Sequence, residues 1–151
     1  MVSIPILLEE LMNQIFQKNS VNTRNTTDSF YNNEILIVDD FPFCILAIEM
    51  ILHNEGFKNT KSFEDPIAVL QYAYQSTRPS VVITDFQMPK INGVELLLEL
   101  DIIFPGIDGI IVTGLPDEAH QYLSRFPILE KGEEVNAKLI DTVLSIVNKN
   151  T

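Results

Sequence analysis

The chain has 151 residues, of which 46% are hydrophobic and 21% are charged, and its formal net charge is −11. This length and apolar content predict one globular domain with a substantial core and exclude a globally disordered chain. The excess of 21 acidic over 10 basic residues disfavours binding to nucleic acids or to anionic membranes.

Other sequence features argue against a membrane or secreted protein. No apolar run approaches the roughly 20 residues that cross a bilayer. Glu9 and Glu10 interrupt the first apolar stretch, which argues against a secretory signal. The single cysteine, Cys44, excludes an intramolecular disulfide, and its apolar surroundings predict a buried core thiol. We therefore expect a cytoplasmic protein.

Two segments precede the main domain. Within residues 1–18, apolar side chains recur at the spacing of one helical face, at Ile4, Leu7, Leu8, Leu11, Met12, Ile15 and Phe16. This pattern predicts an N-terminal amphipathic helix. Residues 19–33 are mostly Asn, Ser and Thr without periodicity, which predicts a polar linker. We expect the helix to pack on its own domain or on a second copy of the chain, as a homodimer.

From residue 34 to residue 151 the sequence alternates short apolar strands with helical patterns. The predicted strands cover 34–38, 57–63, 80–84, 109–113 and 126–130, and the predicted helices cover 42–55, 66–77, 93–104, 116–125 and 135–148. Near-continuous Ile, Val and Leu runs indicate strands buried on both faces of a parallel sheet. Five βα units of this length predict an α/β fold of the flavodoxin-like type, a doubly wound five-stranded parallel sheet with an N-terminal helical extension.

Several helix starts carry specific signals. Pro42, Pro66 and Pro116 each stand where a first helical residue is expected. Asp65 is a predicted N-cap for the second helix. Asn92, followed three residues later by Glu95, predicts a capping box at the start of the third.

Chemically reactive side chains follow the predicted strands. The first strand is followed by Asp39 and Asp40 and the third by Asp85, the fourth ends in Thr113, and Lys131 follows the fifth. Because ligands of such sheets bind outside the carboxyl ends of the strands, we expect these groups to converge on one rim. Taken singly, Thr113 is better interpreted as an ordinary strand residue and Lys131 as a solvated lysine. The set together favours a common site.

Three clustered carboxylates repel one another unless a cation lies among them. Oxygen ligands of this kind suit Mg²⁺, which also accepts phosphate oxygens. A carboxylate is a competent nucleophile toward phosphorus, and phosphoryl transfer needs cations around the transferred group. Mg²⁺ and Lys131 would supply that charge, and the Thr113 hydroxyl could bond the attached phosphoryl group. The rim therefore predicts magnesium-dependent phosphoryl transfer.

Four motifs resemble the receiver domain of two-component response regulators. They are ILIVDD at 35–40, TDFQMPKINGVEL at 84–96, IIVTG at 110–114 and ILEKG at 128–132, and the resemblance covers residues 34–150. The resemblance implies that Asp85 accepts a phosphoryl group. It implies that Mg²⁺ is held by Asp40, Asp85 and the main-chain carbonyl of Gln87, and that Asp39 holds a metal-bound water. It also implies that Thr113 is the switch hydroxyl and that Lys131 is the counter-ion of the phosphoryl group.

The sequence departs from this family at three places. Gly132 follows the lysine where the family usually has a cis-proline, so the turn must form in another way. Ile128 stands where the family has its switch aromatic. Lys131 lies only 18 positions after Thr113, which predicts a short fourth helix or short flanking loops. Leu115, near the expected approach of a hydrolytic water and opposite Gln87, is expected to slow hydrolysis of an aspartyl phosphate.

The resemblance implies a stand-alone response regulator that is phosphorylated on Asp85 by a sensor histidine kinase or a histidine phosphotransfer protein. It would catalyse its own phosphorylation and slow dephosphorylation, and it would signal to a downstream protein target. One alternative is a phosphorylation-independent interaction module, which the departures at Ile128 and Gly132 favour. Another, a magnesium-dependent phosphohydrolase, needs a second acid two residues after the nucleophile, where Gln87 stands.

Overall fold

The computed structural model describes residues 34–150, and the predicted helix over 1–18 and linker over 19–33 lie outside this range. Five strands form one parallel sheet in the order β2-β1-β3-β4-β5. Their bounds are β1 Ile35–Val38, β2 Thr60–Phe63, β3 Val81–Thr84, β4 Gly109–Thr113 and β5 Ile128–Glu130. The expected flavodoxin-like, five-stranded parallel sheet is confirmed.

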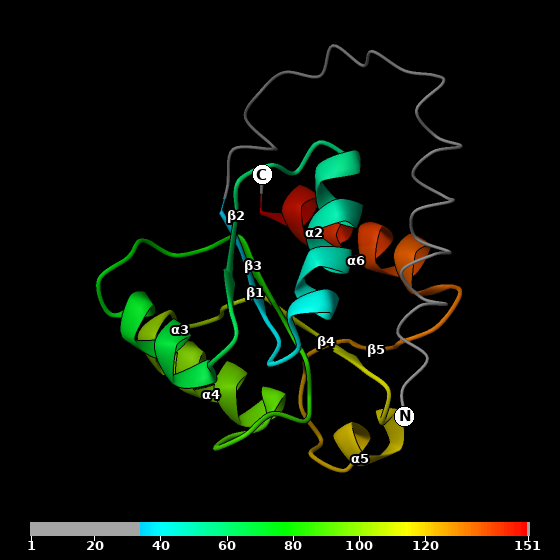
Figure 1. Cartoon of the computed structure of the whole chain (residues 1–151). Helices are drawn as coiled ribbons and strands as arrows, with labels where there is room; N and C mark the ends of the chain where they lie inside the picture. Colours follow the sequence, from blue (N-terminus) through cyan, green and yellow to red (C-terminus); the bar gives the residue numbers. More distant parts are fainter. Residues whose placement is uncertain (1–33, 151) are drawn as a thin grey trace.

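Helices cover both faces of the sheet (Figure 1). Their bounds are α2 Pro42–Asn54, α3 Pro66–Ala73, α4 Gly93–Ile103, α5 Pro116–His120 and α6 Val135–Lys149. Buried side chains of α2 and α6 belong to one core cluster, and those of α3, α4 and α5 belong to a second cluster. Each face of the sheet therefore has its own hydrophobic core. Among the described residues, no helix is long and apolar enough to cross a bilayer.

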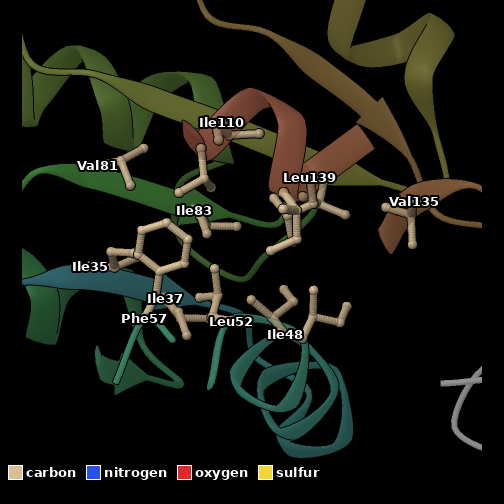
Figure 2. Packing of buried hydrophobic residues seen from close by; sticks show 14 of the residues in the cluster. Ile35, Ile37, Ile48, Leu52, Phe57, Val81, Ile83, Ile110, Val135 and Leu139 are labelled. Carbon is tan, nitrogen blue, oxygen red and sulfur yellow. The ribbon is translucent and has the colours of Figure 1, made fainter. Parts of the chain in front are cut away.

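The inner strands explain the continuous apolar runs of the sequence. Every residue of β1, β3 and β4 is buried. Along β1, Ile35 and Ile37 belong to the cluster under α2 and α6, where Figure 2 shows them packed near Phe57 and Leu52. Leu36, which lies between them, belongs to the other cluster. Since alternate residues of a strand face opposite sides, only a fully apolar strand can serve both cores.

The predicted helix starts are confirmed. Proline stands at the start of α2, α3 and α5. The Asp65 carboxylate accepts a hydrogen bond from the Ile67 backbone N–H at 2.8 Å. Asn92 and Glu95 form the capping box, with N–O distances of 2.9 and 3.4 Å. These bonds satisfy N–H groups that a helix end leaves without partners, and they fix the loops that lead into α3 and α4.

Some element bounds differ from the prediction. Strand β2 begins at Thr60, not at residue 57, because the chain first meets β1 where the Asn59 carbonyl accepts from the Ile35 N–H. Helix α5 ends at His120, not at residue 125. There the N–H groups of Tyr122 and Leu123 bond to carbonyls three residues back, and Leu123 has a φ of 43°. The predicted shortness of this region is thereby confirmed.

Candidate functional site

The strand register brings the predicted site residues to one rim. Val38 of β1 pairs with Thr84 of β3, so Asp39 and Asp85 follow neighbouring residues of adjacent strands. Thr113 of β4 pairs with Glu130 of β5, and Lys131 comes next. A cleft of about 660 Å³ opens at this rim; it is lined by Asp40, Asp85, Gln87, Met88, Pro89, Thr113, Gly114, Leu115 and Lys131. The expected convergence at the carboxyl ends of the strands is therefore observed.

The three carboxylates form a compact cluster. Asp39, Asp40 and Asp85 each offer one oxygen, and these oxygens lie within 4.8 Å of one another. Asp39 is buried, Asp85 is half-buried and Asp40 is exposed. Among residues 34–150 no other group of three His, Cys, Asp or Glu side chains has this geometry. A set of hard oxygen donors open to solvent on one side fits a small divalent cation that keeps some of its waters.

Lys131 joins two of these carboxylates. Its Nζ atom lies 3.4 Å from Asp39 Oδ2 and 3.4 Å from Asp85 Oδ1. The Lys131 N–H also donates to the Thr113 carbonyl at 2.8 Å, which anchors the backbone of the lysine to β4. Asp39 is 1% exposed and Lys131 is 23% exposed, so the pair is screened from water on most sides. The lysine therefore supplies a fixed positive charge beside Asp85.

Cys44 belongs to this site and not to the core, contrary to the sequence prediction. It is half-buried in the first turn of α2, and its Sγ atom lies 3.8 Å from Lys131 Nζ. Burial, followed by the charge of Asp39, raises the pKa of the Cys44 thiol, so the neutral form is favoured. The thiol therefore lies against the ammonium group of Lys131.

Backbone N–H groups orient two of the carboxylates. Asp39 Oδ1 accepts from the Phe41 N–H at 2.9 Å, and Asp85 Oδ1 accepts from the Phe86 N–H at 2.8 Å. The Asp85 N–H itself donates to the Val38 carbonyl at 2.9 Å, which fixes the backbone of Asp85 to β1. Both carboxylates are thus positioned before any ligand arrives, which lowers the cost of forming a site.

Burial dominates the electrostatics of the cluster. It raises the pKa of Asp85 from 3.8 to about 6, although Lys131 pulls in the opposite direction. Burial likewise raises the pKa of Asp39, again against the effect of Lys131. Burial opposes the charge of Lys131 too, but Asp39 and Asp85 more than offset it and raise the pKa of the lysine. The carboxylates therefore lack positive charge, and a divalent cation would supply it.

The lack of positive charge around the carboxylates predicts that the stability of the protein depends on pH when a chelator removes metal ions. Because folded Asp85 binds its proton more tightly than the unfolded chain does, its contribution to stability falls as pH rises from about 4 to 7. At about 1.4 kcal/mol per pKa unit, ionised Asp85 costs roughly 1–3 kcal/mol at pH 7. Asp85→Asn should therefore stabilise the metal-free protein at pH 7 by that amount, and by much less at pH 4. Urea unfolding of both proteins at the two pH values measures this, and an equal difference at both would contradict it.

Thr113 lies where the sequence predicts it. The residue is 1% exposed, lines the cleft, and accepts a hydrogen bond at Oγ1 from the Leu115 N–H at 2.9 Å. That bond leaves the hydroxyl proton available for an acceptor in the cleft. Leu115 and Gln87 both line the same cleft, as predicted from their positions in the sequence.

Gly93 allows the loop after Asp85 to close tightly. Its N–H donates to the Phe86 carbonyl at 2.8 Å, and a Cβ atom at this position would lie 2.2 Å from the Asp85 carbonyl oxygen. The backbone that carries Asp85 can approach α4 only because Gly93 has no side chain.

We expect Gly93→Ala to lower the free energy of unfolding by about 2 kcal/mol or more, because the new methyl group displaces backbone and not a flexible side chain. Urea denaturation measures the loss. Gly132→Ala is the matched control, since a Cβ there would meet no heavy atom within 4 Å. Equal stability of Gly93→Ala and the wild type would contradict the close approach.

The departures from the family pattern have simple structural outcomes. The described chain has no cis peptide bond, and the turn after Lys131 closes through a hydrogen bond from the Val135 N–H to the Gly132 carbonyl at 3.2 Å. Ile128 is partly buried and packs against the cluster of α3, α4 and α5. One contact near the site was not predicted. The Phe86 ring lies edge-on to the Tyr122 ring, with centroids 5.6 Å apart.

Comparison with known proteins identifies relatives. Chemotaxis protein CheY-3 of Vibrio cholerae is 36% identical over 66 residues, which cover 44% of this chain and 50% of that protein. BvgA of Bordetella pertussis, a transcription regulator of virulence factors, is 29% identical over 84 residues, which cover 56% of this chain. The match covers only 40% of BvgA, so the chain corresponds to a part of that longer protein.

Solved structures agree with the sequence comparison. A response regulator receiver domain protein from Clostridium thermocellum superposes with a TM-score of 0.69 at 25% identity, covering 78% of this chain and 96% of that one. The receiver domain of a sensor histidine kinase from Pseudomonas aeruginosa, which holds a magnesium ion in its active-site cleft, gives 0.66 at 21% identity and shares the fold, covering 77% and 98%. The sequence model of the response regulator receiver domain matches residues 35–125. With more than half of its length matched, the chain belongs to the receiver-domain family of two-component systems.

Proposed function

We propose that the protein accepts a phosphoryl group on Asp85 from a phosphohistidine donor, in a magnesium-dependent reaction, and thereby switches its contacts with a downstream protein. One observation carries this proposal. Lys131 Nζ lies 3.4 Å from Asp85 at the edge of an open cleft that Thr113 also lines. A nucleophile, a fixed cation and a hydroxyl thus face one space that is large enough for a phosphoryl group.

The carboxylate cluster is the proposed metal site. Asp40 and Asp85 would hold Mg²⁺ directly, together with the main-chain carbonyl of Gln87, and Asp39 would hold a metal-bound water. When bound, Mg²⁺ supplies positive charge to the oxygens of the transferred group. The distances within the cluster and the deficit of positive charge around Asp85 support this assignment.

The protein's own groups account for the rest of the chemistry. An Asp85 carboxylate oxygen attacks phosphorus, the new P–O bond forms as the P–N bond of the phosphohistidine breaks, and the imidazole leaves with the electron pair of that bond. Lys131 stabilises the negative oxygens of the transferred group. The Thr113 hydroxyl donates to one of them. Hydrolysis later reverses the modification, and the attached group shifts a two-state equilibrium of the domain.

The partners and the domain organisation are part of the same proposal. We infer a sensor histidine kinase or a histidine phosphotransfer protein as the donor, in the cytoplasm, and a protein as the target. We take residues 34–151 as the receiver domain, with residues 19–33 as a linker and residues 1–18 as a helix that docks on this domain or on a second copy. The net charge of −11 supports a protein target over nucleic acid or membrane.

The test is direct phosphorylation. The full chain is incubated with acetyl phosphate in Mg²⁺ or in a chelator, and intact-protein mass spectrometry counts the phosphoryl groups. We expect one group per chain only with Mg²⁺, and its loss on treatment with hydroxylamine, which cleaves acyl phosphates. No incorporation from acetyl phosphate or from a phosphorylated histidine phosphotransfer protein would overturn the proposal. It would favour the phosphorylation-independent module, the second candidate, to which the substitutions at Ile128 and Gly132 point.

Leu115 is predicted to set the lifetime of the modification. It lies at the mouth of the cleft with 36% of its surface exposed, and its apolar side chain restricts water near the acyl phosphate. We expect Leu115→Glu to shorten the lifetime by roughly tenfold, because a carboxylate there can hold a water molecule without being a fully positioned base. Leu115→Met is the control. Loss of phosphate over time in chelator measures the effect, and an unchanged lifetime in Leu115→Glu would contradict it.

A further inference from the structure

The contact between Phe86 and Tyr122 joins the site to an exposed part of the surface. The two rings meet edge to face, with centroids 5.6 Å apart and planes inclined at 66°. Phe86 is 6% exposed, while Tyr122, in the turn after α5, is 48% exposed. The Tyr122 ring therefore covers the buried ring of Phe86, the residue that follows Asp85 in the chain.

Phe86 is coupled to the Asp85 carboxylate through its own backbone. Its N–H donates to Asp85 Oδ1 at 2.8 Å, and its carbonyl accepts from the Gly93 N–H at 2.8 Å. Because the N–H, the carbonyl and the ring belong to one residue, the seating of the ring helps to set the direction of the N–H. Tyr122 is the exposed member of the ring pair that fixes this seating.

The segment that carries Tyr122 is attached to the site at its other end as well. Leu115, immediately before α5, donates its N–H to Thr113 Oγ1 at 2.9 Å. Helix α5 has only five residues, so the two attachments are close in sequence. Between them, Ala119 is fully buried in the core cluster that also contains Phe86. Asp85, through Phe86, and Thr113 are therefore both connected to the same short segment.

We propose that Tyr122 is a positioning residue for the phosphoryl acceptor, acting through Phe86, and that occupation of Asp85 in turn changes the surroundings of the Tyr122 ring. This inference rests on the proposed function of Asp85. For binding free energies the two directions are linked, because a ring contact that favours the occupied site is itself favoured by occupation. Tyr122 thereby links the buried site to the exposed surface after α5.

Kinetics test the first direction. Phosphorylation of the full chain by acetyl phosphate is compared in the wild type, Tyr122→Phe, Tyr122→Ala and Tyr74→Ala. We expect Tyr122→Ala to slow the reaction about two- to tenfold, the range that an aromatic pair of this kind accounts for. Tyr122→Phe keeps the ring and should restore the rate. Tyr74, which is 75% exposed on the end of α3, is the control for removing a surface tyrosine. Equal rates in all four proteins would overturn the inference.

Spectroscopy tests the second direction in a folded, unsubstituted protein. The chain has four tyrosines, and NMR spectra of isotope-labelled tyrosine rings resolve them, with Tyr122→Phe and Tyr74→Phe giving the assignments. We expect beryllofluoride, a phosphoryl mimic, with Mg²⁺ to move the Tyr122 signal and to leave the Tyr74 signal in place. If beryllofluoride binds and the Tyr122 signal does not move, the inference fails and the proposed function stands. If beryllofluoride does not bind at all, both fail.

Discussion

We expect Asp85→Asn to take up no phosphoryl group from acetyl phosphate while it keeps the fold of the wild type. The amide has no negative charge and does not attack phosphorus, so the acceptor is lost. It also removes one of the three carboxylates of the cluster, and the affinity for Mg²⁺ should fall with it. Intact-protein mass spectrometry after incubation with donor and Mg²⁺ measures the first effect, and calorimetric titration with Mg²⁺ measures the second.

The substitution is suited to this purpose because it preserves the local hydrogen bonds. The carbonyl oxygen of the new side-chain amide can accept from the Phe86 N–H as Asp85 Oδ1 does, and the backbone bond to Val38 does not involve the side chain. Loss of phosphorylation therefore cannot be attributed to unfolding. Asp141→Asn, on the exposed side of α6, is the control for removing one negative charge. Phosphate that persists in Asp85→Asn would place the acceptor elsewhere and would contradict the proposed function.

The sequence was sufficient for the sheet and for the rim. Continuous apolar runs identified the buried strands β1, β3 and β4, because such strands must serve two cores at once. Because neighbouring parallel strands have their carboxyl ends at the same edge of the sheet, the residues that follow them lie close together at that edge. Asp39, Asp40 and Asp85 were predicted to lie together for this reason, and their oxygens lie within 4.8 Å of one another.

Sequence patterns did not predict contacts that depend on three-dimensional packing. Cys44 lies in an apolar run and resembles a core residue, yet it meets Lys131, which is 87 positions away in the chain. The end of α5 was missed because the pattern of apolar residues continues past His120, while the backbone turns at Leu123 with a φ of 43°. Tyr122, which contacts Phe86, lies just before Leu123 in the turn after α5. No periodicity in the sequence marks this contact.

Lys131 allows the most discriminating prediction about mechanism. Its ammonium group lies 3.4 Å from both Asp39 and Asp85, where it would face the transferred oxygens. Removing a single fixed donor to a developing negative charge typically slows a reaction by two to three orders of magnitude. We therefore expect Lys131→Met, which keeps an unbranched side chain without the charge, to slow phosphorylation by about a hundredfold.

Lys131→Met should not lower the affinity for Mg²⁺, although it slows phosphorylation. Lys131 now neutralises part of the charge on two cluster carboxylates and so competes with Mg²⁺ for them. At a pH where both carboxylates are ionised, Mg²⁺ should therefore bind Lys131→Met at least as tightly as the wild type. A slow reaction with intact metal binding distinguishes a group that acts on the transferred phosphoryl from one that only holds the site together. Lys138→Met, on the solvent side of α6 with 61% of its side chain exposed, controls for the lost charge. A parallel loss of rate and of Mg²⁺ affinity in Lys131→Met would assign the lysine a structural role, and the proposed stabilisation of the phosphoryl oxygens would then have to come from other groups of the cleft.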